Sequence, residues 1–129
     1  MQRTTLSDLR KMQDAAADKR RVRGAQPITI DGIRFDSKRE ARRWQDLKLL
    51  EAAGEITDLE RQVAFPLNGA KGPILTPTGK QAFYFADFRY RDNRLGGAVV
   101  VEDAKGHPTD SYLLKKAILA ADGVTIEEV

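Results

Sequence analysis

The sequence predicts an α/β protein in which a mixed central sheet is flanked by helices. Three observations predict this class. A long amphipathic helix pattern covers residues 36–54, and three segments rich in β-branched and aromatic residues follow it. A second helix pattern and a last short strand then complete the sequence. This order, helix, three strands, helix, strand, is typical of folds in which helices cover a sheet.

The composition limits both the number of domains and the chemistry. The 129 residues suffice for one hydrophobic core. The chain has no cysteine and one histidine, His107, which excludes disulfides and any Cys-rich or His-rich metal centre. A metal ion must therefore bind to oxygen ligands. We expect one domain over residues 25–129, preceded by a basic arm, residues 1–24, that is partly helical or flexible.

The charge pattern suggests a polyanionic partner. The net charge is +3, and the cations gather in the segments "DKRRVR" and "SKREARR". Such clusters allow the binding of a polyanion. No apolar run reaches the ~20 residues that cross a bilayer, and the first residues lack the apolar core of a signal peptide. We therefore expect a cytoplasmic protein without a membrane partner.

A hairpin and a helix are the first predicted elements. Residues 28–35, "ITIDGIRF", place two short β-rich runs around Asp31 and Gly32, which tolerate the positive φ angles of a type I′ turn. Asp36 or Ser37 can open the helix, and Gly54 can end it. One apolar stripe marks the side of this helix that packs: Ala41, Trp44, Leu47 and Leu50.

The later elements alternate between strands and a helix. The segment rich in Gly and Pro, residues 68–80, is predicted to be an irregular, mobile loop. Thr109 or Asp110 can cap the second helix. The remaining predicted elements are strands at residues 55–67, 81–90 and 98–105, a helix at residues 110–121 and a strand at residues 124–129.

Charge interrupts the third strand where an apolar run would be expected. The stretch "VVVEDAKGH" runs from three valines directly into Glu102 and Asp103. Because strand side chains alternate, Asp103 and Lys105 should share a face, and Glu102 should be a surface charge or the partner of a helix cation. Strand pairing would bring Asp87, on the preceding strand, close to Asp103. Two such carboxylates repel each other unless a cation lies between them, and oxygen ligands suit Mg²⁺ or Mn²⁺.

The same residues resemble a nuclease signature. Asp87, followed by Asp103 and Lys105, resembles the Asp…(Asp/Glu)-x-Lys motif of the PD-(D/E)xK nuclease superfamily, with Ala86 in place of the proline. The element order also resembles that superfamily's restriction-endonuclease-like core. More narrowly, "FDSKREARRWQDLKLLEAAGEITDLERQ", "ADFRY" and "VVEDAKG" resemble a family of small phage and prophage proteins assigned to the superfamily, over residues 28–129.

This resemblance implies a divalent-metal-dependent endonuclease that hydrolyses DNA phosphodiester bonds, in phage DNA metabolism within a bacterial host. It implies Mg²⁺ (or Mn²⁺) held by Asp87, Asp103 and the backbone carbonyl of Ala104. Some superfamily members take a further acidic ligand from the first core helix, and Glu40 matches that position. Lys105 would orient or deprotonate the attacking water and offset the developing negative charge.

Each of these residues also has a structural interpretation. Ser37 and Glu40 form a capping-box pattern, in which Glu40 would bond a backbone amide at the helix start. Asp87 could be a satisfied polar residue at a strand end, and Lys105 a solvated strand terminus. A lone loop histidine such as His107 is expected to be solvated.

Other polar residues are candidates for supporting roles. Gln62 is a candidate accessory residue that binds a water near the metal, or else a hydrogen-bonded strand residue. Lys115 and Lys116 could also be the solvated face of their helix. On the nuclease hypothesis, the residues expected to bind nucleic acid are Arg20, Arg21, Arg23, Arg39, Lys115 and Lys116.

Two other functions stay open at the level of sequence. The chain could be a catalytically weak DNA-binding module of the same fold, or a nuclease for branched DNA such as a Holliday-junction resolvase. Cutting both strands of a duplex calls for two copies of one site, so a homodimer is also considered. Its contact would lie near residues 28–35 and the helix that carries Trp44.

Overall fold

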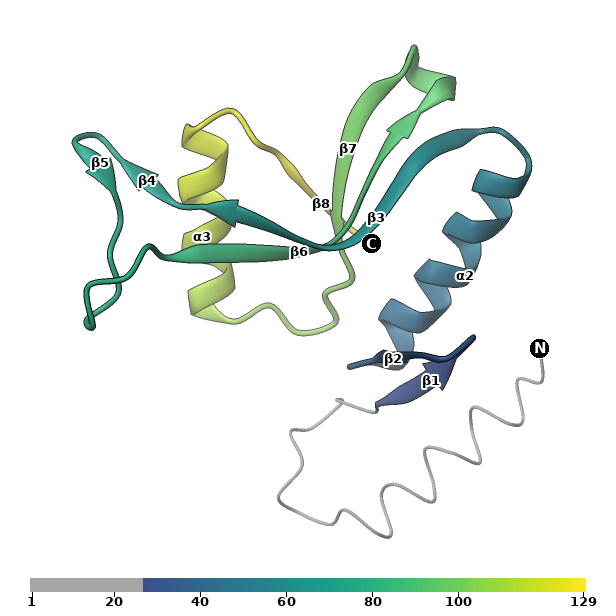
Figure 1. Ribbon diagram of the computed structural model, residues 1–129, viewed down its shortest axis with the longest axis horizontal. Helices are drawn as coiled ribbons and strands as arrows, with labels where there is room; N and C mark the ends of the chain where they lie inside the picture. Colours follow the sequence, from purple (N-terminus) through teal and green to yellow (C-terminus); the bar gives the residue numbers. More distant parts are fainter. Residues whose placement is uncertain (1–26) are drawn as a thin grey trace, which may run out of the picture. The chain divides into compact units, whose positions relative to one another are not determined.

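The computed structural model describes residues 27–129 (Figure 1). The predicted basic arm, residues 1–24, lies outside the described residues. The chain divides into two compact units, Met1–Asp46 and Leu47–Val129. Helix α2 (Lys38–Ala52) begins in the first unit and ends in the second.

The first unit contains the predicted hairpin. Strands β1 (Ile28–Ile30) and β2 (Ile33–Phe35) pair in antiparallel fashion. Asp31 and Gly32 have φ angles of 53° and 77°, the positive values that a type I′ turn requires. The hairpin prediction is therefore confirmed, because an Asp-Gly pair adopts these angles with little strain.

Helix α2 has the predicted ends. The amide of Glu40 donates a hydrogen bond to Ser37 Oγ at 3.1 Å, which satisfies one amide at the helix start. After the last turn, Gly54 has a φ of 77°, which favours glycine. The rings of Phe35 and Trp44 lie 6.0 Å apart. They belong to the apolar cluster of the first unit, formed by Ile28, Phe35 and Ala41 with Ile30, Ile33 and Trp44 packed against them.

The second unit is built on a mixed four-stranded sheet. Its spatial order is β3-β6-β7-β8, with the first three strands antiparallel and the last parallel to β7. A short 3₁₀ turn (Asn93–Leu95) joins β6 to β7. The α/β class and the order helix, three strands, helix, strand are thus confirmed. The strands are β3 (Ile56–Pro66), β6 (Phe83–Asp92), β7 (Ala98–Asp103) and β8 (Ile126–Glu128).

The predicted irregular loop at residues 68–80 is wrong in part, because the segment contains a second hairpin. Strands β4 (Asn68–Gly69) and β5 (Gly72–Pro73) pair with each other and extend the β3–β6 ribbon (Figure 1). The side chain of Gln81 donates to the carbonyl of Leu67 at 2.7 Å and ties the two sides together. The Gly-rich and Pro-rich composition predicted an irregular backbone here. Strands β4 and β5 are only two residues long, so a few backbone hydrogen bonds are enough to pair them.

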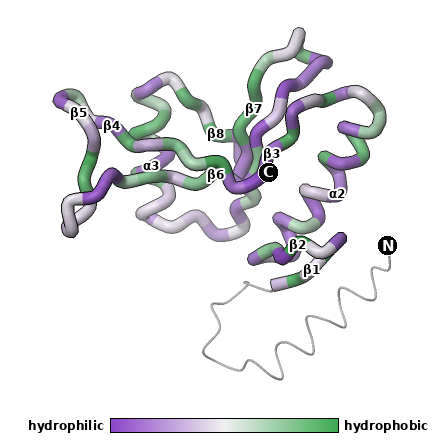
Figure 2. Tube along the Cα trace, in the orientation of Figure 1, coloured by the Kyte–Doolittle hydropathy of each residue, from purple (hydrophilic) through white to green (hydrophobic). Residues whose placement is uncertain are grey.

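Helix α3 (Asp110–Ala121) connects β7 to β8 and packs on the ribbon. Thr109 Oγ accepts a hydrogen bond from the Tyr112 amide at 3.1 Å, which confirms the predicted cap. Figure 2 shows β7 as a hydrophobic stretch within this unit. Among residues 27–129, no helix is long and apolar enough to cross a membrane. The core between α3 and the strands consists of Leu67, Tyr84, Ala86, Val101, Tyr112, Leu119 and Ile126.

Candidate active site

Strand pairing brings Asp87 and Asp103 together. Phe88 on β6 pairs with Glu102 on β7, so Asp87 and Asp103 are the next residues on the two strands. Asp87 Oδ2 accepts a hydrogen bond from the amide of Ala104 at 2.9 Å. The Asp87 carboxylate therefore lies against the backbone where β7 ends.

The carboxyl group of Asp103 is buried without a hydrogen bond. Its side chain is 1% exposed, and within residues 27–129 neither of its oxygens has a hydrogen-bond partner. The nearest cation is Lys105, whose Nζ lies 4.0 Å from Asp103 Oδ1. Burial raises the pKa of Asp103 to about 6. The positive charge of Lys105 opposes that rise, and the negative charge of Glu128 adds to it.

Lys105 reaches Asp103 by a different route from the one predicted. Strand β7 ends at Asp103, so Lys105 lies in the following loop and strand alternation does not place it. Its ammonium group instead lies 4.8 Å from the centre of the Tyr112 ring, a cation–π contact. Helix α3 therefore helps to hold Lys105 beside Asp103.

Tyr112 and Glu128 belong to this site although the sequence did not single them out. Glu128 pairs with Asp103 across the parallel strands β7 and β8. Tyr112 donates its hydroxyl to Glu128 Oε2 at 3.0 Å, and Lys116 Nζ donates to the same oxygen at 2.8 Å. These two bonds lower the pKa of Glu128. Burial, followed by the bond to Glu128, raises the pKa of Tyr112, so the phenol stays protonated and remains a donor.

Gln62 contacts Asp87 from an unusual backbone conformation. Arg61 pairs with Phe88 and Val63 pairs with Ala86, so Gln62 lies opposite Asp87. Its Nε2 donates to Asp87 Oδ1 at 3.4 Å, a long hydrogen bond. The φ of Gln62 is 51°, a positive value that is uncommon for a residue other than glycine.

Glu40 lies in the first unit, whereas Asp87 and Asp103 lie in the second. Its side chain is buried, with 5% of its surface exposed. The bond from its backbone amide to Ser37 Oγ supplies one half of the capping box. The role of Glu40 as a metal ligand stays a prediction.

The predicted nucleic-acid contacts divide into three groups. Arg20, Arg21 and Arg23 lie outside the described residues. Arg39 is exposed on α2. Lys115 and Lys116 make intramolecular contacts. Lys115 Nζ donates a hydrogen bond to the Phe83 carbonyl at 3.3 Å, and Lys116 forms an ion pair with Glu128. His107 is exposed in its loop, as predicted.

The prediction that Glu102 is a surface charge is wrong, whereas its alternative role as the partner of a helix cation stays a prediction. Its side chain is buried, with 2% of the residue exposed, and it accepts a hydrogen bond from the Tyr90 hydroxyl. Tyr90 and Phe88 are buried on the same face of the sheet, so Glu102 points into the interior. The alternation of strand side chains correctly predicted that Glu102 faces away from Asp103. That face of the sheet is buried rather than exposed to solvent.

The family of the chain follows from a comparison with protein-family models. Residues 20–126 match the family described as "Protein of unknown function (DUF1064)". The chain belongs to this family. The family match includes Gln62, Asp87, Asp103 and Lys105, and it ends two residues before Glu128. No curated protein and no solved structure matches the chain.

The oxygen atoms of this DUF1064 protein's site suit a divalent cation. Asp103 is a buried carboxyl group without a hydrogen bond from the described residues, and a cation would offset the cost of its burial. The Asp87 carboxylate is adjacent. Within residues 27–129, no three His, Cys, Asp or Glu side chains form a group that could hold a metal by themselves. Asp87 and Asp103 alone would leave the shell of a bound ion incomplete, so further oxygen ligands would be needed.

Proposed function

We propose that this protein is a divalent-metal-dependent endonuclease that hydrolyses DNA phosphodiester bonds, with Asp87, Asp103 and Lys105 at its centre. The observation that carries the proposal is the Asp103 carboxyl group, which is 1% exposed and lacks a hydrogen bond from any described residue. A purely structural core would favour an apolar residue there, because a carboxylate buried without a hydrogen bond is costly. A buried acid beside a second acid and a lysine is the arrangement expected of a catalytic centre.

The proposed fold is the restriction-endonuclease-like core of the PD-(D/E)xK nucleases. The order α2, β3, β6, β7, α3, β8 and the parallel pairing of β8 with β7 support this proposal. So do the positions of Asp87 on β6 and of Asp103 at the last residue of β7. The motif therefore falls on two adjacent strands of one sheet.

The ligands proposed for Mg²⁺ or Mn²⁺ are the carboxylates of Asp87 and Asp103, the carbonyl of Ala104 and the carboxylate of Glu40. All are hard oxygen donors, which these ions prefer. When bound, the ion supplies Lewis-acid stabilisation of negative charge on the scissile phosphate. The Glu40→Gln substitution tests the fourth ligand, because it leaves the backbone bond to Ser37 intact. We expect weaker Mn²⁺ binding at an unchanged melting temperature, and unchanged binding would leave only the cap.

Lys105 would act on the attacking water and on the phosphate. Its ammonium group is held between Asp103 and the Tyr112 ring, at 4.0 Å from Asp103 Oδ1 and 4.8 Å from the ring centre. From there Lys105 can orient the water and offset the charge that develops as water oxygen bonds to phosphorus and the bond to the leaving oxygen breaks. No covalent bond between protein and DNA is needed.

The experiment that tests the proposal uses the purified protein and its Asp103→Asn variant. Each is incubated with linear, nicked, branched and single-stranded DNA, in Mg²⁺, in Mn²⁺ and in chelator. We expect cleavage by the wild-type protein with either ion, none with chelator, and none by the variant. Asp46→Asn, at an exposed position of α2, is the matched control and should cleave normally. Equal cleavage by the Asp103→Asn variant, or no cleavage of any DNA by the wild type, would refute the proposal.

A further inference from the structure

Two exposed phenylalanines precede Asp87 on strand β6. Phe83 is 39% exposed and Phe85 is 57% exposed, whereas Tyr84 and Ala86 between and beside them are buried. Because side chains alternate along a strand, Phe83 and Phe85 lie on the exposed face of the β3–β6 ribbon, opposite Tyr84 and Ala86, which pack in the core with α3. At ~3.3 Å per residue, Phe85 is about 7 Å from Asp87 along the strand. An aromatic surface therefore adjoins the carboxylate.

The residues paired with Phe83 and Phe85 on strand β3 have small side chains. Phe83 pairs with Pro66 and Phe85 pairs with Ala64 across the β3–β6 ribbon. The ring centroids of Phe83 and Phe85 lie 6.3 Å apart, with the planes tilted by 36°. The short side chains of Ala64 and Pro66 cannot cover rings of this size. These four residues form what we call the Phe83–Phe85 surface.

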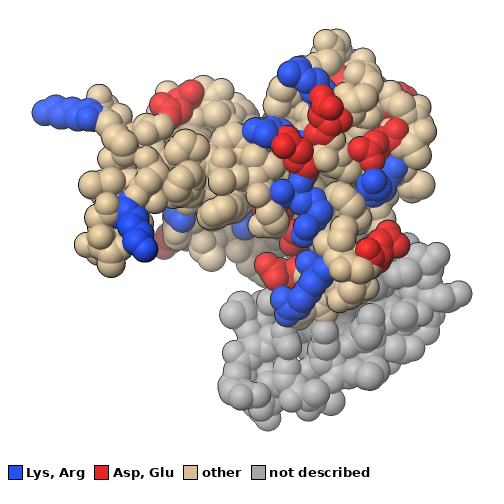
Figure 3. All heavy atoms as spheres, viewed as in Figure 1, with Lys and Arg blue, Asp and Glu red and all other residues tan. Residues whose placement is uncertain are grey.

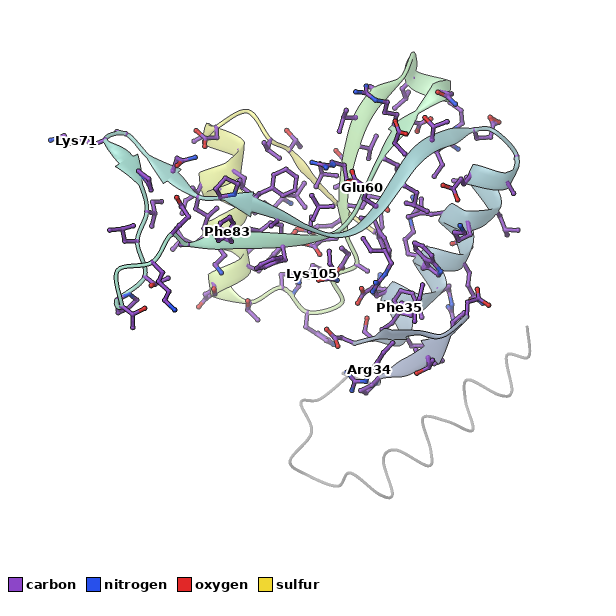
Figure 4. All side chains as sticks on the ribbon, viewed as in Figure 1. Arg34, Phe35, Glu60, Lys71, Phe83 and Lys105 are labelled. Carbon is purple, nitrogen blue, oxygen red and sulfur yellow. The ribbon has the colours of Figure 1, made fainter. Side chains whose placement is uncertain are left out.

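The chain segment that carries this surface contains cations and no acidic residue. Residues 61–86 contain Arg61, Lys71 and Lys80 but no aspartate or glutamate. Lys71 and Lys80 are exposed. Figure 3 shows Lys and Arg side chains without acidic ones at the tip of the β4–β5 hairpin, and Figure 4 shows Phe83 on β6 between that hairpin, which carries Lys71, and the region of Lys105. Cations beside exposed aromatic rings are the features that bind single-stranded nucleic acid.

We infer that the Phe83–Phe85 surface stacks on unpaired bases of the DNA strand whose phosphodiester reaches Asp87 and Asp103. In a duplex the faces of the bases stack on each other, whereas unpaired bases expose a face that an aromatic ring can cover. Lys71 and Lys80 would neutralise phosphates of the same strand. The substrate class is therefore DNA with unpaired nucleotides beside the cleavage point: a single strand, a flap or a branch. The cleavage part of this inference rests on the proposed function, and the binding part does not.

Binding is tested in chelator, so that cleavage plays no part. Fluorescence anisotropy is measured with labelled oligo-dT, with a blunt duplex and with the same duplex carrying a single-stranded tail. We expect Phe85→Ala to weaken binding of oligo-dT and of the tailed duplex about tenfold, as loss of one stacked ring does, with little effect on the blunt duplex. Phe85→Leu, which keeps apolar area without a ring face, should behave like Phe85→Ala. Leu95→Ala, at a residue 62% exposed in the turn after the other end of β6, is the control and should bind normally.

A second variant reports on stacking itself. The chain has one tryptophan, Trp44, so Phe85→Trp adds a single new signal. We expect Phe85→Trp to bind like the wild type and its added emission to be quenched by oligo-dT. Unchanged binding by Phe85→Ala, or unquenched emission of Phe85→Trp, would overturn the inference. Concentration-dependent sedimentation that Phe85→Ala abolishes, with DNA binding unchanged, would also overturn it and would assign the surface to a second copy.

The two proposals fail separately. Loss of oligo-dT binding in Phe85→Ala, without cleavage of any DNA by the wild type in Mg²⁺ or Mn²⁺, would support the stacking surface and refute the nuclease. Equal cleavage of blunt and tailed duplex by the wild type and by Phe85→Ala would support the nuclease and overturn the stacking surface.

Discussion

Replacing Asp103 by asparagine should stabilise the folded protein at neutral pH in the absence of metal. The wild-type carboxyl group is 1% exposed, lacks a hydrogen bond from the described residues, and has a pKa raised by burial from 3.8 to about 6. Each pKa unit corresponds to ~1.4 kcal/mol, so the ionised carboxylate lowers the free energy of unfolding by about 3 kcal/mol. The buried amide of the variant also needs partners, which costs about 1 kcal/mol or more. We therefore expect a net gain of about 1–2 kcal/mol at pH 7.

The sign of this effect depends on pH. A raised pKa means that the folded state binds the Asp103 proton more tightly than the unfolded state does. Below 3.8 both states are protonated, and the penalty is absent. It develops as pH rises from 3.8 to about 6 and is complete above that value. The stability difference between Asp103→Asn and the wild type should therefore grow over this interval and then level off.

Urea unfolding followed by circular dichroism, in chelator and between pH 4 and pH 8, measures the difference. Asp46→Asn again provides the control, because it removes one negative charge from an exposed position. Addition of Mn²⁺ at pH 7 should stabilise the wild type and not the Asp103→Asn variant, since binding to the folded state adds to its stability. A variant less stable than the wild type at pH 7, or a difference that is the same at pH 4 and pH 7, would refute this reasoning.

Three other predictions follow from the same region and from the basic arm. Tyr112→Phe keeps the ring beneath Lys105 but loses the hydroxyl bond to Glu128, so urea unfolding should show a loss of about 1 kcal/mol; an unchanged value would mean that the bond adds no stability. Gln62→Gly relieves a positive φ, a strain of about 1 kcal/mol, but removes the contact with Asp87. Cleavage should therefore fall while stability holds or rises, and a stability loss as large as that of Gln62→Ala would contradict the strain. Deletion of residues 1–23 should weaken DNA binding and flatten its salt dependence, because each neutralised phosphate releases counterions; an unchanged salt slope would exclude the arm from the contact.

Local patterns in the sequence were sufficient for most elements of the fold. Asp31-Gly32 predicted the first turn, Ser37 and Gly54 predicted the ends of α2, and Thr109 predicted the start of α3. These features depend on residues a few positions apart, whose backbone preferences act wherever the segment lies. The segment 68–80 was harder to predict, because the β4–β5 hairpin depends on anchoring by the ribbon on both sides rather than on its own Gly-rich and Pro-rich sequence.

The sequence by itself identified three residues of the candidate site. Asp87, Asp103 and Lys105 stood out because charge follows apolar strand residues, and antiparallel pairing across a short turn predicted that the two acids would be neighbours. Burial could not be predicted in the same way. Alternation placed Glu102 on the opposite face, but whether that face meets water depends on what packs against it.

Only the tertiary structure decided which residues surround Asp103. The sequence does not specify which strand lies beside β7 or in which register, and the parallel pairing with β8 brings Glu128 next to Asp103. Helix α3 brings the Tyr112 ring under Lys105, although the strand that was expected to orient this lysine ends two residues earlier. Contacts between segments distant in the chain set the burial of Asp103 and its raised pKa, because desolvation and the charges around a group depend on three-dimensional packing.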